Sequence, residues 1–534
     1  MKHQPVAPAE WVEHALALQV NRRRFLKRTA LVGLTATTAT AFLAACEQLA
    51  TPTPATTATP TPRPTATPTP FATPTQRPTA TSPPVPTPTA TPRAVLTTED
   101  ARVSHLLRRA GFGASTAELA EFRAMGLDAA IDHLVDFDGI DNGALDERLA
   151  AQEIDFERLG HIQRWWLQRM AYTARPLEEK MTLFWHGILT SSFRKTGSGP
   201  AMYHQNVLLR HMGMDRYNAM LKSVSRDPAM LIYLDSRKNK KGKPNENYSR
   251  ELMELFTLGI GNYTEDDVRE SARAFTGSQV RGQEEFIFNA RQHDTGDKTF
   301  LGKTGNWDGD DVVDIITSQP VAAEYIARRL WEFFAYPDPE PAIVARLAQV
   351  FREGDTRIRP VVRSIFESDE FYGPRAVHAL VKGPAELVAT TVRSLGIDTN
   401  FAVLTRRVTA MGQELFAPPN VAGWDGGATW INSATLLERI NMANAVATGR
   451  GSRLRFEPTR LIDADRDTPP REIIDFLVDL LLGGEVQAAT GEAMIAHLRE
   501  LAIPRATTGR IAPFDEQLRS LVYLVLASPD YQVA

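Results

Sequence analysis

Two carboxylates in the segment PNENYSRELMELF stand at a spacing that can support chemistry. Glu251 and Glu254 are three residues apart, and Asn247 precedes Glu251 by four. On an α-helix these side chains share one face, because residues three and four apart lie one turn from each other. Two carboxylates on one face can ligate a metal ion together, or can act as acid and base when their environments separate their pKa values.

The same segment also fits an ordinary solvated helix face. Arg250 is four residues from both Glu246 and Glu254 and can pair with either of them. Asn245, just before the helix, is a typical N-cap residue. The acidic side chains therefore indicate either a reaction centre or an ion network, and the spacing leaves both open.

Two histidines are candidates to complete a reaction centre. His186 lies in the apolar stretch LFWHGILT, and His293 stands beside Asp294. Neutral imidazole is a common metal ligand and a general base near pH 7. One hypothesis is thus a catalytic site of Glu251, Glu254, His186, His293 and Asp294, whose two glutamates and two histidines bind a divalent metal of open identity. The alternative for each imidazole is a packed core histidine.

Aromatic residues in PPNVAGWDGGATWI provide a possible ligand surface. Trp424 and Trp430 have flat faces that can stack on a sugar ring, or can close the core. With Asn247 they are the side chains expected to contact a ligand, for which a polysaccharide is the fitting class. The sequence contains no His-Glu-x-x-His helix, no paired-cysteine zinc motif and no Gly-x-Ser-x-Gly elbow, so the common hydrolase signatures are absent.

The elements that must position these residues are mainly helices. Ser115 with Glu118, and Thr264 with Asp267, have the spacing of capping boxes. Alternation of apolar and polar residues over 284–302 predicts a small β-hairpin. We expect a mainly α fold, a large multi-helix globular domain with this hairpin inserted. Apolar residues at helical spacing predict further helices over 156–172, 176–189, 321–336, 343–352, 385–395, 434–446, 473–482 and 515–527.

Residues 1–46 resemble a twin-arginine export signal that ends in a lipobox. NRRRFLK is followed by a mildly apolar stretch and by LAAC, which ends at Cys46. Cleavage before Cys46 would leave a lipid-carrying cysteine that anchors the chain in a bilayer. A membrane span is the alternative, but the apolar stretch is shorter than the roughly 20 residues that a span needs. We expect a membrane-anchored lipoprotein on the extracytoplasmic side of the cell envelope.

A stalk is expected over residues 47–94. Its main part, 51–93, holds 14 Pro and 16 Thr and no acidic residue. Proline at this density favours extended polyproline II and excludes helix and sheet, so this linker is predicted to be disordered. Beyond it, the folded part carries a net charge of about −10, because the overall charge of −4 includes basic residues near the N-terminus. Such an acidic body is a poor partner for nucleic acid.

Several segments in order resemble a bacterial family catalogued as domain of unknown function number 1800. They are HLLRRAGFG (105–113), EKMTLFWHG (179–187), SRDPAMLIYLD (225–235), PNENYSRELMELFTLGIGNYTEDDV (244–268), HDTGDKTFLG (293–302) and PPNVAGWDGGATWINSATLLERIN (418–441). The resemblance implies an exported, largely helical protein of no agreed activity, often encoded beside a co-exported protein of a sulfatase-like family. Members commonly have His where this chain has Phe256, so a ligand at that position would be missing here.

Two functions remain open at this point. The first is a metal-assisted enzyme that acts on an extracellular polymer, with the carboxylates and histidines above as its site. The second is a non-catalytic binding or assembly protein at the cell surface, in which the polar motifs form a buried structural network. For either, residues 95–450 are expected to form the family domain and residues 451–534 to add C-terminal helices packed on it.

Overall fold

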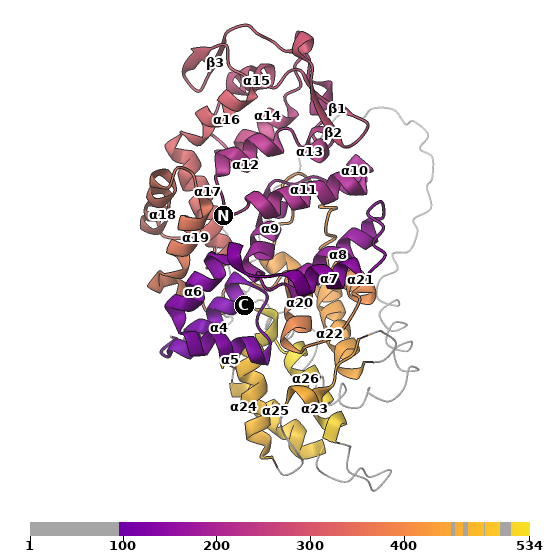
Figure 1. Ribbon diagram of the computed structural model, residues 1–534. Helices are drawn as coiled ribbons and strands as arrows, with labels where there is room; N and C mark the ends of the chain where they lie inside the picture. Colours follow the sequence, from indigo (N-terminus) through magenta and orange to yellow (C-terminus); the bar gives the residue numbers. More distant parts are fainter. Residues whose placement is uncertain (1–95, 450–453, 463–467, 485, 487, 502–513) are drawn as a thin grey trace, which may run out of the picture. The chain divides into compact units, whose positions relative to one another are not determined.

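The computed structural model describes residues 96–449, 454–462, 468–484, 486, 488–501 and 514–534. The predicted export signal with Cys46, and the predicted stalk over 47–94, lie outside the described residues. Helices dominate the described part, which contains 23 α-helices and two small two-stranded sheets (Figure 1). The expected mainly α fold class is confirmed.

The helices follow one another with short connections. The α-helices are α4 (Glu99–Ala110), α5 (Thr116–Met125), α6 (Leu127–Val135), α7 (Gly143–Ala150), α8 (Leu159–Tyr172), α9 (Pro176–Ile188), α10 (Phe193–Thr196), α11 (Gly199–Met212), α12 (Tyr217–Val224), α13 (Pro228–Tyr233), α14 (Asn247–Glu251), α15 (Glu265–Ala274), α16 (Gly309–Thr317), α17 (Pro320–Phe334), α18 (Pro341–Glu353), α19 (Ile358–Phe366), α20 (Pro384–Ser394), α21 (Ala402–Ala410), α22 (Ser433–Thr448), α23 (Pro458–Leu461), α24 (Pro470–Leu482), α25 (Ala488–Leu501) and α26 (Phe514–Ala527). Short 3-10 helices are η1 (Phe137–Gly139), η2 (Ser236–Lys238), η4 (Ala290–Gln292), η5 (Asp369–Tyr372), η6 (Gly427–Trp430) and η7 (Asp530–Gln532), and η3 (Leu252–Thr257) is a π-helix.

Both predicted capping boxes begin helices. At α5 the Ser115 hydroxyl accepts from Glu118 N at 3.3 Å, while the Glu118 carboxylate accepts from Ser115 N at 2.8 Å. Thr264 and Asp267 make the same exchange at α15. Each box pairs N–H groups that the first helical turn leaves without a partner. The eight helices predicted from apolar spacing are also present, with ends shifted by at most three residues.

The strands differ in detail from the single hairpin predicted over 284–302. There are two antiparallel hairpins, in which β1 (Ser278–Arg281) pairs with β2 (Glu285–Phe288), and β3 (Lys298–Phe300) pairs with β4 (Lys303–Gly305). The alternating residues that led to the prediction form β2. Its partner precedes it in the chain and lacks a comparable apolar alternation, which is why the prediction missed β1.

The turn between β3 and β4 explains the second hairpin. Its two residues, Leu301 and Gly302, have φ of 45° and 77°. Two successive positive φ values make a type I′ turn, whose twist matches that of the paired strands. Leu301 adopts this unfavourable conformation while its N–H donates to a carboxylate oxygen of Asp267 at 2.7 Å. The capping residue of α15 therefore also fixes the hairpin.

The apolar core encloses one helix almost entirely. Every residue of α9 except Gly187 is buried, and α9 contacts α4, α6, α8 and α11. Polar groups on α9 must therefore find partners inside the protein, since a buried polar group without one costs a few kcal/mol. None of the helices in the described residues combines the length and apolarity needed to span a bilayer.

The last residues of the chain are joined to the first described helix by Arg109 of α4. Its guanidinium is buried and donates to Phe334 O at 2.7 Å, to Ala534 O at 2.8 Å and to Ala335 O. Ala534 N in turn donates to Leu380 O at 2.9 Å. One arginine thus holds together three segments that lie far apart in sequence.

A second buried arginine links α22 to the C-terminal region. Arg439 donates to Lys382 O at 2.8 Å and to the side chain of Gln532 at 3.2 Å. The Lys382 ammonium donates to Tyr531 O at 2.8 Å. Along the same side, α22 packs against α26, as Figure 1 shows.

Candidate functional site

The predicted acidic face begins on α14 and continues onto the π-helix η3. Here the N–H of Leu258 donates to Met253 O at 2.8 Å, a bond that spans five residues instead of four. A π-turn holds more residues than an α-turn, so side chains that follow α14 are rotated away from their α-helical positions. The spacing argument that placed Glu251 and Glu254 on one α-helical face therefore applies only in part.

The two glutamates have different surroundings. Both are half-buried. Glu254 accepts a hydrogen bond of 2.7 Å from the Tyr263 hydroxyl. Burial raises the pKa of Glu251, and the neighbouring carboxylate of Glu254 raises it further. Glu251 therefore keeps its proton to a higher pH than an ordinary glutamate does, while Glu254 accepts a hydrogen bond.

The residues around the acidic pair behave as an ordinary helix surface. Arg250 pairs with Glu265 at 2.8 Å and with Glu246 at 3.4 Å. Asn247 is exposed, and its N–H donates to the Asn245 side chain at 3.2 Å. The N-cap of α14 is Glu246, whose side chain makes no capping hydrogen bond, so the expectation that Asn245 is the N-cap is wrong by one position. The ion network considered from sequence therefore exists, with Glu265 as the closer partner of the arginine.

His186 is a core histidine. Its Nε2 accepts from Phe416 N at 3.1 Å, and its ring packs 5.0 Å from that of Trp166 and 5.6 Å from that of Trp424. Burial lowers the pKa of His186 to about 3, which keeps the imidazole neutral. Of the two candidate sugar-stacking residues, Trp424 is half-buried against this histidine and Trp430 is only 8% exposed.

His293 and Asp294 lie between the two hairpins. His293 Nδ1 is 2.9 Å from Thr276 O, and its ring packs against that of Phe288. The Asp294 carboxylate accepts from Arg273 Nε at 2.9 Å, and this bond lowers the pKa of Asp294 to about 2. Asp294 thus links the segment between the two hairpins to α15, and His293 links it to the residues that follow α15.

The four predicted metal ligands do not come together. Within the part of the chain that the structure describes, no group of three or more His, Cys, Asp and Glu side chains could hold a metal ion. His186 and His293 are each engaged by a main-chain group, and the glutamates lie on α14 and η3. The expectation of a convergent ligand set is corrected accordingly, because spacing within one helix cannot bring distant histidines to it.

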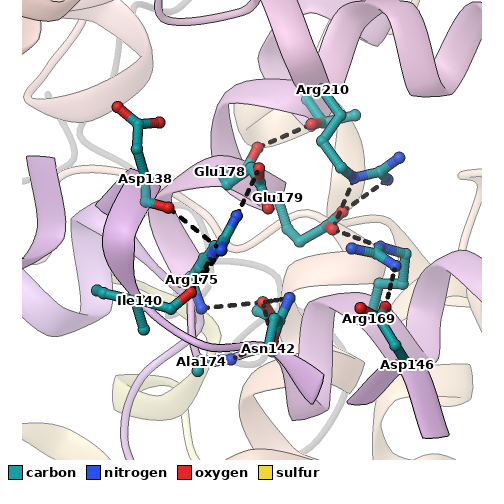
Figure 2. Close-up of polar contacts among 12 residues, drawn as sticks. Asp138, Ile140, Asn142, Asp146, Arg169, Ala174, Arg175, Glu178, Glu179 and Arg210 are labelled. Atoms are coloured by element: carbon teal, nitrogen blue, oxygen red, sulfur yellow. Dashed lines mark hydrogen bonds and ion pairs between the residues drawn. The ribbon is translucent and has the colours of Figure 1, made fainter. Parts of the chain in front are cut away.

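A buried ion cluster forms instead around Glu179 of α9. The carboxylate is fully buried and accepts from Arg210 Nε at 2.8 Å, from Arg169 Nε at 2.7 Å and from Trp166 Nε1 at 2.9 Å. Figure 2 shows it between the two guanidinium groups, with Arg169 also directed toward Asp146. Burial opposes ionisation of Glu179, but the two arginines outweigh it and lower the pKa of this carboxyl. The cluster joins α8, α9 and α11.

A second buried polar cluster lies where α11 meets α13. Asp227 caps α13 by accepting from Met230 N at 2.8 Å, and it also accepts from Gln205 Nε2 at 2.7 Å. The Gln205 carbonyl oxygen accepts from the Ser191 hydroxyl. Burial raises the pKa of Asp227 to about 7. The nearby Tyr248 hydroxyl is buried and has no hydrogen-bond partner among the described residues.

The surface has an open groove between α8 and α21. Its volume is about 560 Å³. The side that α8 provides includes His161, Gln163 and Arg164, and the side that α21 provides includes Thr405 and Arg406. The remaining lining residues are Gly160, Ala402, Thr409 and Ala410. Among its described lining residues the groove therefore has two arginines and a histidine, and no acidic side chain.

Sequence reasoning did not single out these clusters. Glu179 did carry a signal, since a charged residue inside an apolar helix must be paired. Arg164 and Arg406 carried none, because each is an unremarkable arginine until the fold sets α8 beside α21. A charge on one helix says nothing of which distant helix will face it.

The model of the family described as "Protein of unknown function (DUF1800)" matches residues 105–533. The chain belongs to the DUF1800 family. The match extends through α26, so the DUF1800 region includes the helices that follow residue 450. No curated protein and no solved structure matches the chain. In this DUF1800 protein Phe256 is fully buried within η3, and its carbonyl accepts from the Tyr217 hydroxyl.

Proposed function

We propose that this DUF1800 protein is an exported, lipid-anchored protein of the cell surface whose helical domain binds a component outside the cytoplasmic membrane. The observation that carries the proposal is that charged residues of the quoted motifs are paired inside the protein core. Glu179 lies in one of the quoted motifs and pairs with Arg169 and Arg210 inside the core. Side chains so engaged specify the packing of helices and leave no charge to face a substrate.

Other motif residues support the same conclusion. Lys180, the neighbour of Glu179, is buried and pairs with Glu386 of α20. Arg109, from the first motif, donates all its hydrogen bonds to main-chain oxygens. In an active site we would expect such groups to border a cavity, whereas here they connect helices.

The N-terminal sequence supports the proposed location at the cell surface. A twin-arginine motif, a lipobox at Cys46 and a Pro/Thr-rich linker are typical of a protein that is exported folded and then tethered to a membrane. At ~3.1 Å per residue in polyproline II, the linker reaches on the order of 130 Å. A binding domain held at that distance can contact material outside the membrane surface.

Localisation is tested with the full-length protein in a bacterium that has the twin-arginine pathway. The wild type is expected in the membrane fraction and accessible to external protease. Cys46→Ser should move the protein to the soluble extracytoplasmic fraction, because lipid attachment is lost. Replacement of Arg22 and Arg23 by Lys should retain it in the cytoplasm. A wild-type protein that stays cytoplasmic would contradict the proposal.

Binding is tested by sedimentation of the purified full-length Cys46→Ser protein with isolated cell envelopes. We expect saturable binding that Glu251→Gln leaves unchanged, because the proposal gives the acidic pair no part in function. Absence of binding would contradict the proposal. So would loss of binding in the Glu251→Gln protein with its stability intact.

A second candidate function is hydrolysis of an extracellular polymer by the acidic pair. The observation that favours it is the separation of environments, with Glu251 protonated more readily and Glu254 held by the Tyr263 hydroxyl. Glu251 would then act as general acid and Glu254 as general base. Release of reducing ends from a polysaccharide, abolished in both Glu251→Gln and Glu254→Gln, would support this function and overturn the first.

A further inference from the structure

We propose that the groove between α8 and α21 binds an acidic polysaccharide, an inference that rests on the binding function proposed above. The starting point is the charge of the groove. Arg164 and Arg406 line it, and no Asp or Glu is among its described lining residues. His161 also lines the groove, but burial and the neighbouring Arg164 lower its pKa, so the charge comes from the two arginines. The first turn of α8, which borders the groove, also lacks an acidic residue.

The two guanidinium groups are available to a ligand. Arg164 uses only Nε, which donates to Gly160 O at 3.2 Å in its own helix. Arg406 is exposed and makes no hydrogen bond or ion pair with a described residue. Many arginines on the described surface instead pair with a carboxylate, as Arg250 does with Glu265. A guanidinium presents a planar fork of donors that matches a carboxylate or sulfate group.

The surrounding charge makes the groove stand out. The folded part of the chain carries about −10, so an anion is repelled by most of the protein and attracted locally. The polar lining fits the rest of a sugar. The hydroxyl of Thr409, which is exposed, donates to Thr405 O at 3.3 Å, and its oxygen can still accept from a sugar hydroxyl.

Size and composition separate this ligand from other anions. A volume of about 560 Å³ lies within the usual range for a ligand site and admits a short stretch of a polysaccharide chain. No Phe, Tyr or Trp is among the described lining residues, so the stacking surface that single-stranded nucleic acid needs is absent. A membrane lipid headgroup is disfavoured by the predicted stalk, which holds the domain away from its own bilayer.

The test uses the full-length Cys46→Ser protein with polygalacturonate as the acidic polysaccharide and dextran as the neutral one. We expect binding to polygalacturonate that weakens steeply with added salt, and no binding to dextran. Arg164→Ala combined with Arg406→Ala should weaken binding about tenfold or more. The double variant Arg164→Lys with Arg406→Lys should bind polygalacturonate with an affinity between those of the wild type and the double alanine variant. Lysine keeps the positive charge but lacks the planar fork of donors.

The matched control is Arg352→Ala. This arginine on α18 is exposed and makes no ion pair with a described residue, yet it is not among the residues that line the groove. Its loss should change the affinity by less than about twofold. Unfolding midpoints equal to that of the wild type will show that each variant is folded. If Arg352→Ala weakens binding as much as the double variant, the attraction is general and the proposal is wrong.

Three further outcomes separate this inference from the function on which it rests. Envelope binding that survives the double groove variant would overturn the groove and leave the binding function standing. Loss of both envelope binding and polygalacturonate binding in that variant would support the groove inference and the proposed binding function. Tighter binding through the groove to anionic phospholipid vesicles or single-stranded DNA than to polygalacturonate would overturn the polysaccharide.

Discussion

Glu179 shows what a charged residue does inside an apolar helix of this protein. Its carboxylate has 0% side-chain exposure and meets two guanidinium groups and an indole N–H. Ion pairs of this kind do not necessarily add stability relative to an apolar core, but removing one partner leaves the other charge buried and unpaired. The pairing of Glu179 with Arg169 and Arg210 is therefore best tested by neutralising the carboxylate alone.

Glu179→Gln is predicted to lower the free energy of unfolding by about 3 to 5 kcal/mol, because Arg169 and Arg210 lose their counter-charge in the core. Chemical denaturation of the full-length protein measures this. Glu285→Gln is the control, since Glu285 pairs with Arg281 on an exposed hairpin surface and should leave the unfolding midpoint unchanged. Equal midpoints for the two variants would show that Glu179 is not a structural charge.

Asp227 makes stability depend on pH. Its pKa is raised to about 7 in the folded protein from an ordinary value of 3.8, because the carboxyl is buried. The folded protein therefore keeps this proton at pH values where the unfolded chain has lost it. As the pH rises between these two values, the contribution of Asp227 shifts the balance toward the unfolded chain.

Asp227→Asn removes this titration while an amide oxygen can still cap α13. We predict that the stability of the variant relative to the wild type increases as the pH rises from about 4 to about 7, by on the order of a few kcal/mol in total. Urea unfolding of both proteins across this interval measures the difference. If the difference in unfolding free energy between the two proteins stays constant across this interval, Asp227 is ionised in the folded protein at all these pH values.

For single residues the sequence indicated several possible roles, but it did not show which residues come together in one site. The choice between a ligand and a packed histidine was open for His186, and the structure shows an imidazole that accepts from Phe416 N. The missing information was the position of residue 416, which is 230 residues away. Local pattern identifies groups able to do chemistry, whereas a site requires groups from several distant segments.

Among the elements, helix starts were the most predictable features. A capping box such as Thr264 with Asp267 is formed within four consecutive residues, so its physics is contained in the sequence. The π-helix η3 was not predictable. Its carbonyls at Leu255 and Phe256 accept from the hydroxyls of Tyr325 and Tyr217, which are 70 and 39 residues away. Tertiary contacts of this kind satisfy a backbone that an isolated helix would not adopt.

Tyr217→Phe tests whether these contacts support η3. The variant leaves the buried carbonyl of Phe256 without its donor and is predicted to lose about 1 to 3 kcal/mol of unfolding free energy. Tyr523→Phe provides the control, because the Tyr523 hydroxyl makes no hydrogen bond with a described residue and its loss should cost less than about 0.5 kcal/mol. A Tyr217→Phe protein as stable as the control would show that η3 forms without this donor.

Across the whole molecule the C-terminal helices take part in the same core. Met442 and Val446 of α22 are buried, and α22 packs against α26. A chain that ends at residue 449 would lose this cover together with the partners of Arg439 and Lys382 at Gln532 and Tyr531. From the sequence we expected the C-terminal helices to pack on the preceding domain, but the sequence did not show which of its residues depend on them.

The chain truncated after residue 449 is predicted to bind a hydrophobic dye such as ANS and to unfold at a much lower denaturant concentration than the full chain. Exposure of the α22 surface is the reason. A chain that lacks residues 1–94 is the control and should keep the full-length midpoint. An unchanged midpoint in the first truncation would show that residues 95–449 fold by themselves.

The hydrogen bonds of Arg109 have a consequence for biosynthesis. Its acceptors lie 225, 226 and 425 residues further along the chain. A ribosome that has made α4 must therefore add the next 425 residues before this guanidinium can reach all three oxygens. Docking of α4 against these segments consequently comes late in synthesis, and until then the arginine of a nascent chain lacks its final partners.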